Sequence, residues 1–145
     1  MSPLERYISF MESVADFDLG NIEAFIAKEI HFVDPFNDTT GIDCYRAIIE
    51  DMRAQLSNLQ ITVLESAMVG DASALIRWQL GGKLSAFKHR PWQVTGCSSV
   101  RFSESGQVIE HVDYWDAAGQ LYESMPLIGS ALKYLRHKLA VKIDQ

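Results

Sequence analysis

The chain has 145 residues, 48% of them hydrophobic, and a net charge of -6 from 19 acidic and 13 basic side chains. A chain of this length is expected to form one globular domain, residues 1–145, whose core needs no disulfide or metal for stability. Cys44 and Cys97 form no CxxC pair, which argues against a disulfide scaffold and against a zinc site. We therefore expect a cytoplasmic protein without a metal or another cofactor.

No apolar run reaches the roughly 18 residues that a membrane span needs, and the N-terminus has no signal-peptide pattern. The negative charge argues against nucleic-acid binding, which depends on clustered Lys and Arg. Residues 127–145 differ, with four basic residues and one acid, a net of +3, against 9 basic and 18 acidic residues, a net of -9, elsewhere. This positive charge can complement a helix dipole, contact the acidic body or bind an anionic membrane. The first two are favoured, because Tyr134 is the one aromatic anchor in the segment.

Two helices are predicted in the first thirty residues. Apolar residues recur every three or four positions over residues 4–17, which is the spacing of one buried helix face. Asp18 can cap the N-terminus of a second helix. The same spacing continues from Ile22 to Ile30, so the second helix is expected to extend to that point.

An extended segment and a third helix are predicted next. Residues 31–34 precede Pro35, and proline disfavours a helical conformation in the residue before it. Thr40 and Asp43 supply the hydroxyl and the later carboxylate that satisfy free N–H groups at a helix start. The third helix is therefore predicted to begin there and to end near residue 56.

From residue 58 the pattern changes to long β-forming segments separated by turns. After the strands, helix-forming residues begin at Ala117, and an amphipathic basic helix is predicted over residues 127–145 beyond Pro126. The strands are predicted over residues 59–69, 74–84, 92–103 and 107–116.

Helices followed by a four-stranded meander predict an α+β fold, in which N-terminal helices pack on one face of a curved, mainly antiparallel sheet and a C-terminal helix follows. Strands of about ten residues are long enough to twist strongly, so the sheet is expected to curl around the helices. Its concave side would hold a small apolar ligand.

This order of elements, with a short strand ending in Asp34-Pro35, resembles the nuclear transport factor 2-like superfamily, which includes ketosteroid isomerases, SnoaL-like polyketide cyclases and limonene-epoxide hydrolases. Asp18-Leu19, Gly41 before the third helix and the run Gly106–Asp116 add to the resemblance. It implies a conical barrel of cystatin-like type, often dimeric, with a pocket between helices and sheet. Because this fold hosts unrelated activities, the chemistry must be argued from individual residues.

Asp34 is the first candidate for acid/base chemistry, since a carboxylate in an apolar pocket can act as a general base. By resemblance it matches the catalytic aspartate of the ketosteroid isomerases, at the same spacing from Asp18-Leu19. An Asp-Pro pair is equally typical of a turn that ends a strand. Both interpretations stay open.

The resemblance to ketosteroid isomerases does not extend to their oxyanion hole, which needs a tyrosine and a protonated aspartic acid. The tyrosine position falls on Phe10, with Tyr7 one turn earlier, and the aspartic acid position falls on Ser98. Phenylalanine cannot donate a hydrogen bond, and serine is a weaker donor than a carboxylic acid. Steroid isomerisation by that mechanism is therefore not expected.

The second candidate is Asp113. Side chains alternate along a strand, so His111, Asp113 and Trp115 are predicted to share one face. In that arrangement the carboxylate orients the imidazole in a pocket that Trp115 keeps dry. A buried His–Asp hydrogen bond with a purely structural role is the alternative.

The run Asp113-Tyr-Trp-Asp116 also resembles the Asp-Tyr-Phe-Asp run of epoxide hydrolases, whose water-activating trio takes an Arg-x-Asp from an earlier strand. Here that segment is Arg77-Trp78-Gln79, so the second carboxylate is missing and epoxide hydrolysis is disfavoured. If Arg77 and Gln79 face the pocket, the apolar residues between and beside them face outward and predict a homodimer through the outer sheet face: Ile76, Trp78 and Leu80.

The favoured hypothesis is a cofactor-free acid/base enzyme of isomerase, cyclase or hydratase/hydrolase type, acting on an apolar carbonyl-containing or polycyclic substrate. The alternative is a non-catalytic ligand-binding or dimerisation domain, which Phe10 and Ser98 in place of strong donors favour. The candidate catalytic residues are Asp113, Asp34 and His111, and the candidate substrate-binding residues are Tyr7, Phe10, Arg77, Ser98 and Trp115.

Overall fold

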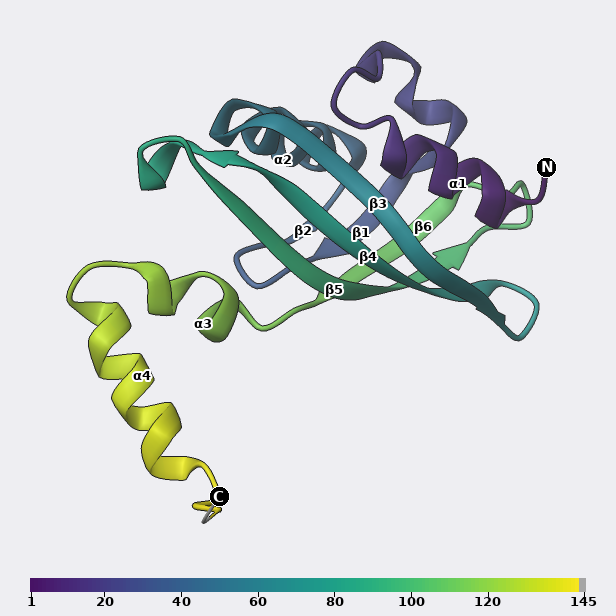
Figure 1. The fold of residues 1–145 in the computed structure, drawn as a ribbon. Coiled ribbons are helices and arrows are strands. Elements are labelled where there is room, and N and C mark those ends of the chain that lie inside the picture. The colour runs from purple at the N-terminus through teal and green to yellow at the C-terminus, as the bar shows by residue number, and fades with distance from the viewer. Residues whose placement is uncertain (144–145) are drawn as a thin grey trace. The chain divides into compact units, whose positions relative to one another are not determined.

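A computed structural model describes residues 1–143, and the chain divides into two compact units, unit 1 (residues 1–115) and unit 2 (from residue 116). Residues 144–145, the end of the predicted basic segment, lie outside the described residues. Unit 1 confirms the predicted α+β class, with helices packed on one curved sheet (Figure 1). Its main elements are α1 (Pro3–Glu12), β1 (Ile26–Val33), β2 (Asp38–Thr40), α2 (Ile42–Gln55), β3 (Leu56–Val69), β4 (Ser73–Leu84), β5 (Arg90–Phe102) and β6 (Val108–Tyr114).

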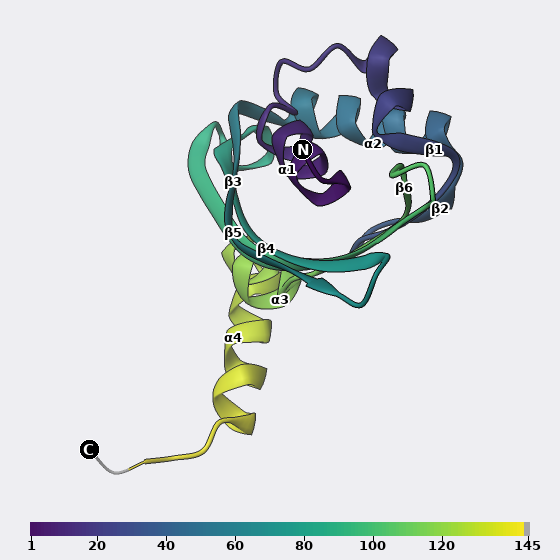
Figure 2. The same cartoon turned by 90° about the vertical axis from the view of Figure 1, so that its right-hand side faces the viewer.

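The sheet has six strands in the order β2-β1-β6-β5-β4-β3. The predicted meander is confirmed as the antiparallel succession from β3 to β6, and β1 joins it parallel to β6. Long twisted strands curl, and Figure 2 shows the sheet curving round α1. The concave face is filled by a core whose fully buried aliphatic side chains are Ile22, Ile26, Ile30, Ile76, Val100 and Val108.

The first helix begins at a capping box. Ser2 Oγ accepts a hydrogen bond from the Glu5 N–H at 3.2 Å, and Glu5 Oε2 accepts one from the Ser2 N–H at 2.7 Å. Proline at the first helical position suits this start, because its missing N–H has no intrahelical partner there. The helix ends at Glu12, earlier than residue 17, and turns its buried face, including Tyr7 and Phe10, toward the core.

The predicted second helix is wrong beyond its first turns. Asp18 does cap a helical segment, accepting from the Gly20 N–H at 2.9 Å, but that segment is a short 3-10 helix over Leu19–Ala24. The chain then enters β1, where Ile26 lies opposite Val108 of β6. The β-branched Ile26 and Ile30 favour a strand, and pairing with β6 buries both completely.

The third helix, α2, lies where it was predicted, although its N-terminus has another cap. Gly41 occupies the N-cap position with φ of 108°, a conformation that glycine adopts without strain, and no side chain caps the helix. Asp43 instead forms an ion pair with Arg46 at 2.6 Å. Thr40 and Asp43 therefore do not form the predicted capping pattern.

Unit 2 consists of α3 (Ala117–Gln120), the 3-10 helix η3 (Tyr122–Ser124) and α4 (Ile128–Leu139). Within this unit α4 packs against η3, and the buried Glu123 side chain accepts a hydrogen bond from Arg136 Nε at 2.6 Å. None of the helices in residues 1–143 is long and apolar enough to cross a membrane.

Candidate functional site

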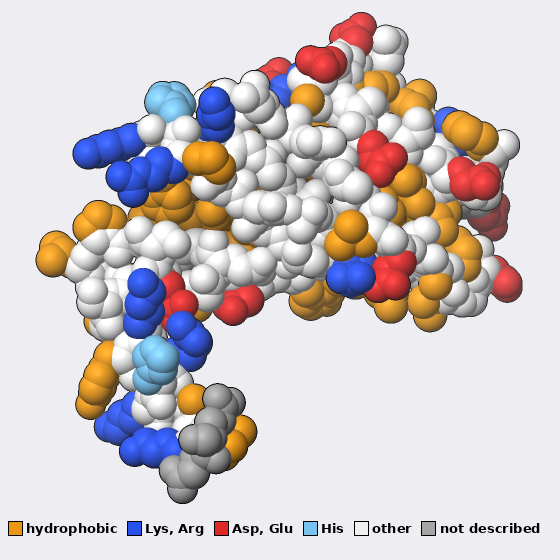
Figure 3. All heavy atoms as spheres, in the orientation of Figure 1, with side chains coloured by type: hydrophobic (Ala, Val, Ile, Leu, Met, Phe, Trp, Pro, Cys, Tyr) orange, Lys and Arg blue, Asp and Glu red, His pale blue; other side chains and the backbone are white. Residues whose placement is uncertain are grey.

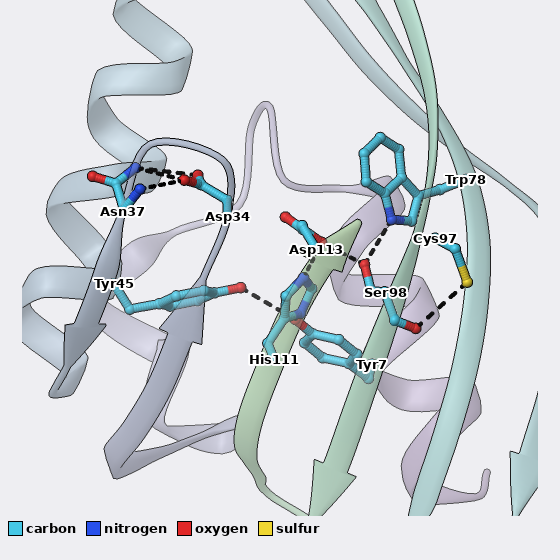
Figure 4. A network of polar contacts seen from close by, with 9 residues as sticks. All are labelled: Tyr7, Asp34, Asn37, Tyr45, Trp78, Cys97, Ser98, His111 and Asp113. Carbon is cyan, nitrogen blue, oxygen red and sulfur yellow. Dashed lines mark hydrogen bonds and ion pairs between the residues drawn. The ribbon is translucent and has the colours of Figure 1, made fainter. Parts of the chain in front are cut away.

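A line of polar contacts crosses the core of unit 1 from the helices to β6 (Figure 4). The hydroxyls of Tyr45, on α2, and Tyr7, on α1, lie 3.2 Å apart. The Tyr7 hydroxyl lies 2.7 Å from His111 Nδ1, and His111 Nε2 lies 2.6 Å from Asp113 Oδ1. The predicted neighbours His111 and Asp113 are therefore in direct contact, with two tyrosines behind the imidazole.

A second line reaches the same carboxylate from the sheet. Trp78 Nε1 on β4 donates a hydrogen bond to Ser98 Oγ on β5 at 2.6 Å. The Ser98 hydroxyl in turn donates to Asp113 Oδ1 at 2.5 Å. We call the six residues that the two lines join the Asp113 network: Tyr7, Tyr45, Trp78, Ser98, His111 and Asp113.

Strand register brings the sheet residues of this network together. Ser98 lies directly opposite Asp113 in the antiparallel β5–β6 pair. Trp78 pairs with Gly96, two residues before Ser98, and its ring lies against that glycine, where a Cβ atom would come within 2.6 Å of the ring. The lack of a side chain at Gly96 therefore leaves the space in which Trp78 reaches Ser98.

We assign the hydrogen bonds of the network a common direction, toward Asp113. An indole N–H only donates and an ionised carboxylate only accepts, so the Trp78 line ends on Asp113. We assign the His111 tautomer whose Nε2–H donates to the carboxylate, so that Nδ1 accepts from the Tyr7 hydroxyl and the Tyr7 oxygen accepts from Tyr45. Burial raises the pKa of the Tyr7 phenol well above its usual 10.0, and it raises the pKa of Tyr45 likewise, so both remain neutral donors.

Asp113 is the point where the network reaches solvent. Ser98 and Tyr7 are at most 1% exposed, whereas the Asp113 side chain is 17% exposed. Both of its contacts end on Oδ1, which leaves Oδ2 as the oxygen available to a ligand. Two residues later, the Trp115 ring contacts the rings of Trp92 and Phe36, with centroids 6.1 and 5.7 Å away. We call these three side chains the aromatic rim.

Asp34 lies in the turn between β1 and β2 and takes the turn role that the sequence left open. Its Oδ1 accepts hydrogen bonds from the N–H groups of Phe36 and Asn37 at 2.8 and 2.7 Å. The Asn37 side-chain amide also contacts both Asp34 oxygens (Figure 4). These contacts close an Asx turn, so the carboxylate that matches the isomerase aspartate is held by its own loop.

Arg77 does not face the concave side, and this prediction was wrong. Arg77 is exposed and pairs with Glu65 of β3, while Ile76 and Trp78 on either side of it are at most 5% exposed. Burying an aliphatic and an indole side chain is far more favourable than burying a guanidinium, which decides the facing of β4. The apolar outer stripe that predicted a homodimer is thus absent, and the dimer stays a prediction without that support.

Phe10, a predicted substrate-binding residue, lies within the core. It is 2% exposed and packs between the rings of Tyr7, Phe17 and Phe25, with centroids 5.0 to 5.8 Å away. It therefore supports the helix that carries Tyr7 and makes no polar contact in the network.

Tyr45 and Trp78 are network residues that sequence reasoning missed as functional candidates. Tyr45 shares the buried face of α2 with Ile42 and Ile49, and a tyrosine among aliphatic residues is the one local signal of a buried hydroxyl that needs a partner. For Trp78 the signal was the alternation of apolar residues along β4, but the sequence pattern predicted these residues on the outer face of the sheet and not on the core face.

An open depression of about 510 Å³ lies over β3, β4 and the start of β5 in unit 1. Trp92 of the aromatic rim lines it, and none of the network residues does. Among residues 1–143, no group of three or more His, Cys, Asp or Glu side chains is placed to hold a metal ion. The Asp113 network and the aromatic rim are therefore the strongest candidate for chemistry.

Residues 7–111 match the family of SnoaL-like domains. The chain belongs to this family. The range that matches the SnoaL-like domain covers most of unit 1 and all members of the Asp113 network except Asp113 itself. A comparison with curated proteins finds no match.

Solved structures share this SnoaL-like fold at low sequence identity. An NTF2-like protein of unknown function from Exiguobacterium sp. 255-15 has a TM-score of 0.67 and 17% identity, covering 79% of this chain and 98% of its own. A SnoaL-like polyketide cyclase from Agrobacterium tumefaciens strain C58 has a TM-score of 0.68 and 12% identity, with coverage of 80% and 92%. SalBIII, an epoxide hydrolase/cyclase-like enzyme of pyran ring formation in the polyether salinomycin, has a TM-score of 0.69 and 12% identity, with coverage of 79% and 90%.

Proposed function

We propose that this SnoaL-like domain is a cofactor-free acid/base enzyme that moves a proton on an apolar, carbonyl-containing substrate, with Asp113 as the acid/base group. The observation that carries the proposal is the convergence of two buried lines of donors on one carboxylate that is itself accessible. Similarity to a polyketide cyclase and to an enzyme of pyran ring formation supports a reaction of cyclase or isomerase type. Similarity at this low identity shows the fold alone, so the mechanism is argued from the residues of this chain.

In the proposed reaction, Asp113 Oδ2 takes a proton from the carbon next to a carbonyl group. The C–H bond breaks, an O–H bond forms on the carboxyl, and the electron pair passes into the carbonyl as an enolate. Asp113 then returns the proton to another carbon, which gives isomerisation, or to the oxygen formed when the enolate closes a ring. The proton count balances without an external acid, base or cofactor.

The other network residues position Asp113. His111 and Ser98 both donate to Oδ1, which fixes the plane of the carboxylate and leaves Oδ2 free for the substrate. Tyr7 holds the imidazole from behind through Nδ1, so it is not free to act as an oxyanion donor. Trp115, two residues after Asp113, brings the aromatic rim into the proposed site, where it would contact the apolar part of a substrate.

The test uses 1-phenyl-1,3-butanedione, an apolar compound with an acidic C–H between two carbonyl groups, and follows its hydrogen exchange in D2O by NMR. The SnoaL-like domain is expected to accelerate exchange with saturation. Asp113→Asn should lower the enzymatic rate by about a hundredfold or more. Asp34→Asn, the matched carboxylate-to-amide change in the turn, should leave the rate within about twofold, because its Oδ1 still accepts the backbone hydrogen bonds.

Equal exchange rates for the parent and for Asp113→Asn would contradict the assignment of Asp113. Saturable binding of the diketone without faster exchange would favour the alternative, a non-catalytic ligand-binding domain. One observation favours that alternative: each buried polar group of the network is satisfied internally, as in a purely structural hydrogen-bond network.

A further inference from the structure

Unit 2 lies beyond the part of the chain that the SnoaL-like family shares. The family match ends at residue 111, and unit 2 begins at residue 116. The three similar structures cover 90–98% of their own chains but only 79–80% of this one. The remaining fifth of this chain corresponds in size to unit 2. Unit 2 can therefore have a role that is separate from the proposed reaction.

One side of α4 is occupied by packing within unit 2. Gly129 lies against the backbone of Glu123, so closely that a Cβ atom on the glycine would overlap the Glu123 carbonyl oxygen. About two turns further along the helix, Arg136 holds the buried Glu123 carboxylate. These contacts attach α4 to η3 through a glycine and an arginine.

The apolar side chains of α4 form a separate stripe. Ile128, Leu135 and Leu139 are separated by seven and four positions, which places them on one helix face. They are 57%, 50% and 77% exposed. Just beyond the helix, Val141 and Ile143 are also exposed. We call Ile128, Leu135 and Leu139 the α4 stripe.

The charges along α4 and the residues that follow it are mainly basic. Unit 2 has four basic residues, all after residue 127, and three acidic residues, Asp116, Glu123 and Asp144, a net of +1, whereas unit 1 has 9 basic and 16 acidic residues, a net of -7. Figure 3 shows Lys and Arg side chains beside hydrophobic ones along this segment. The basic residues are Lys133, Arg136, Lys138 and Lys142.

We infer that α4 and residues 140–143 bind an anionic lipid surface. The α4 stripe would lie at the boundary between headgroups and acyl chains, and the lysines would contact the anionic headgroups while their methylene stems follow the apolar boundary. A lipid surface accepts an apolar stripe without a complementary groove, and an anionic one attracts residues 127–145, whose net charge is +3. Because unit 1 is acidic, attraction to such a surface acts through unit 2 and orients the chain with unit 2 toward the lipid.

The sequence alone favoured helix-dipole or intramolecular roles for these charges, because tyrosine is the only aromatic anchor. A segment without Trp or Phe binds a membrane weakly. Such binding is reversible and depends on salt. The exposure of the α4 stripe is the structural observation that adds an apolar contribution to the charge.

The test sediments the full chain with vesicles of phosphatidylcholine alone and of equal parts phosphatidylcholine and phosphatidylglycerol. Binding is expected to the mixed vesicles and not to the neutral ones, and high salt should release it. The double variant K133E/K138E should lower affinity by about tenfold or more. The matched control K28E/K83E makes the same change of charge at two exposed positions of unit 1, and its affinity should stay within about threefold of the parent.

A second variant, Leu135→Asp, tests the apolar contribution and should also weaken binding by about tenfold or more. Circular dichroism and size-exclusion chromatography with light scattering accompany each variant. The inference is overturned if the parent ignores mixed vesicles, if it binds neutral vesicles equally well, or if K28E/K83E weakens binding as much as K133E/K138E. It is also overturned if Leu135→Asp leaves vesicle binding unchanged while splitting an oligomer, because a second copy then covers the α4 stripe.

Discussion

The β1–β2 turn and the Asp113 network each contain an aspartate that the sequence marked as a possible acid/base group, and their surroundings differ. Asp34 accepts from N–H groups two and three residues further along its own loop. Asp113 accepts from a strand neighbour and an imidazole that are supported by two helices and β4. A carboxylate satisfied by its own loop shapes the backbone, whereas one held by distant elements can be presented to a ligand in a fixed orientation.

The largest expected effect on stability comes from the tight packing of Trp78 within the Asp113 network. Gly96→Ala places a Cβ atom 2.6 Å from the Trp78 ring and should lower the free energy of unfolding by about 2 kcal/mol or more, because the ring that supports Ser98 must move. Gly81→Ala is the control in the neighbouring strand, since its Cβ atom meets nothing closer than 3.6 Å. Urea unfolding measures both, and equal losses would contradict the tight seat of Trp78.

Deletion of single hydroxyls tests the direction of the network. Tyr7→Phe leaves His111 Nδ1 buried without its donor and should lower the free energy of unfolding by about 2 kcal/mol. Tyr45→Phe removes the outermost donor and should cost about 1 kcal/mol, since the Tyr7 hydroxyl keeps His111 as its acceptor. A larger loss in Tyr45→Phe than in Tyr7→Phe would show that the hydrogen bonds do not run toward Asp113.

Substitutions in the β1–β2 turn are expected to lower stability less than those in the Asp113 network. Asp34→Ala removes the acceptor of two backbone N–H groups and should lower the free energy of unfolding by about 1 kcal/mol. Asp34→Asn retains an acceptor oxygen and should cost about half of that or less. Thermal or urea unfolding of the two variants measures this difference; a turn that tolerates alanine as well as asparagine does not depend on these bonds.

The smallest expected effect is a pH dependence of stability that arises from His31 in the β1–β2 hairpin. A hydrogen bond to Asp38 raises the pKa of the exposed His31, with a smaller contribution from Glu110. Because the folded-state pKa is the higher one, this contribution to stability is present below the unfolded-state value of 6.5 and is lost as pH rises through the folded-state value. His31→Gln should remove this slope in urea unfolding, and an unchanged slope would assign it to another group.

Much of the fold follows from local sequence. Strand propensity and turn residues predict the four strands of the meander, because long β-branched segments between turns have few alternative structures. The first helix follows from the spacing of its apolar residues. The contact of His111 with Asp113 follows from alternation alone, since residues two apart on a strand share a face wherever the strand lies.

The sequence by itself thus determined the class of fold, the four strands of the meander and one pair of site residues. Only the tertiary structure decided that Ile26 and Ile30 belong to a strand beside β6, that Trp78 and not Arg77 faces the core, and that Tyr45 completes the line behind His111. The physical reason is common to these cases. Periodicity shows which side chains share a face, but the face that is buried, and the partner it meets, depend on elements distant in the chain.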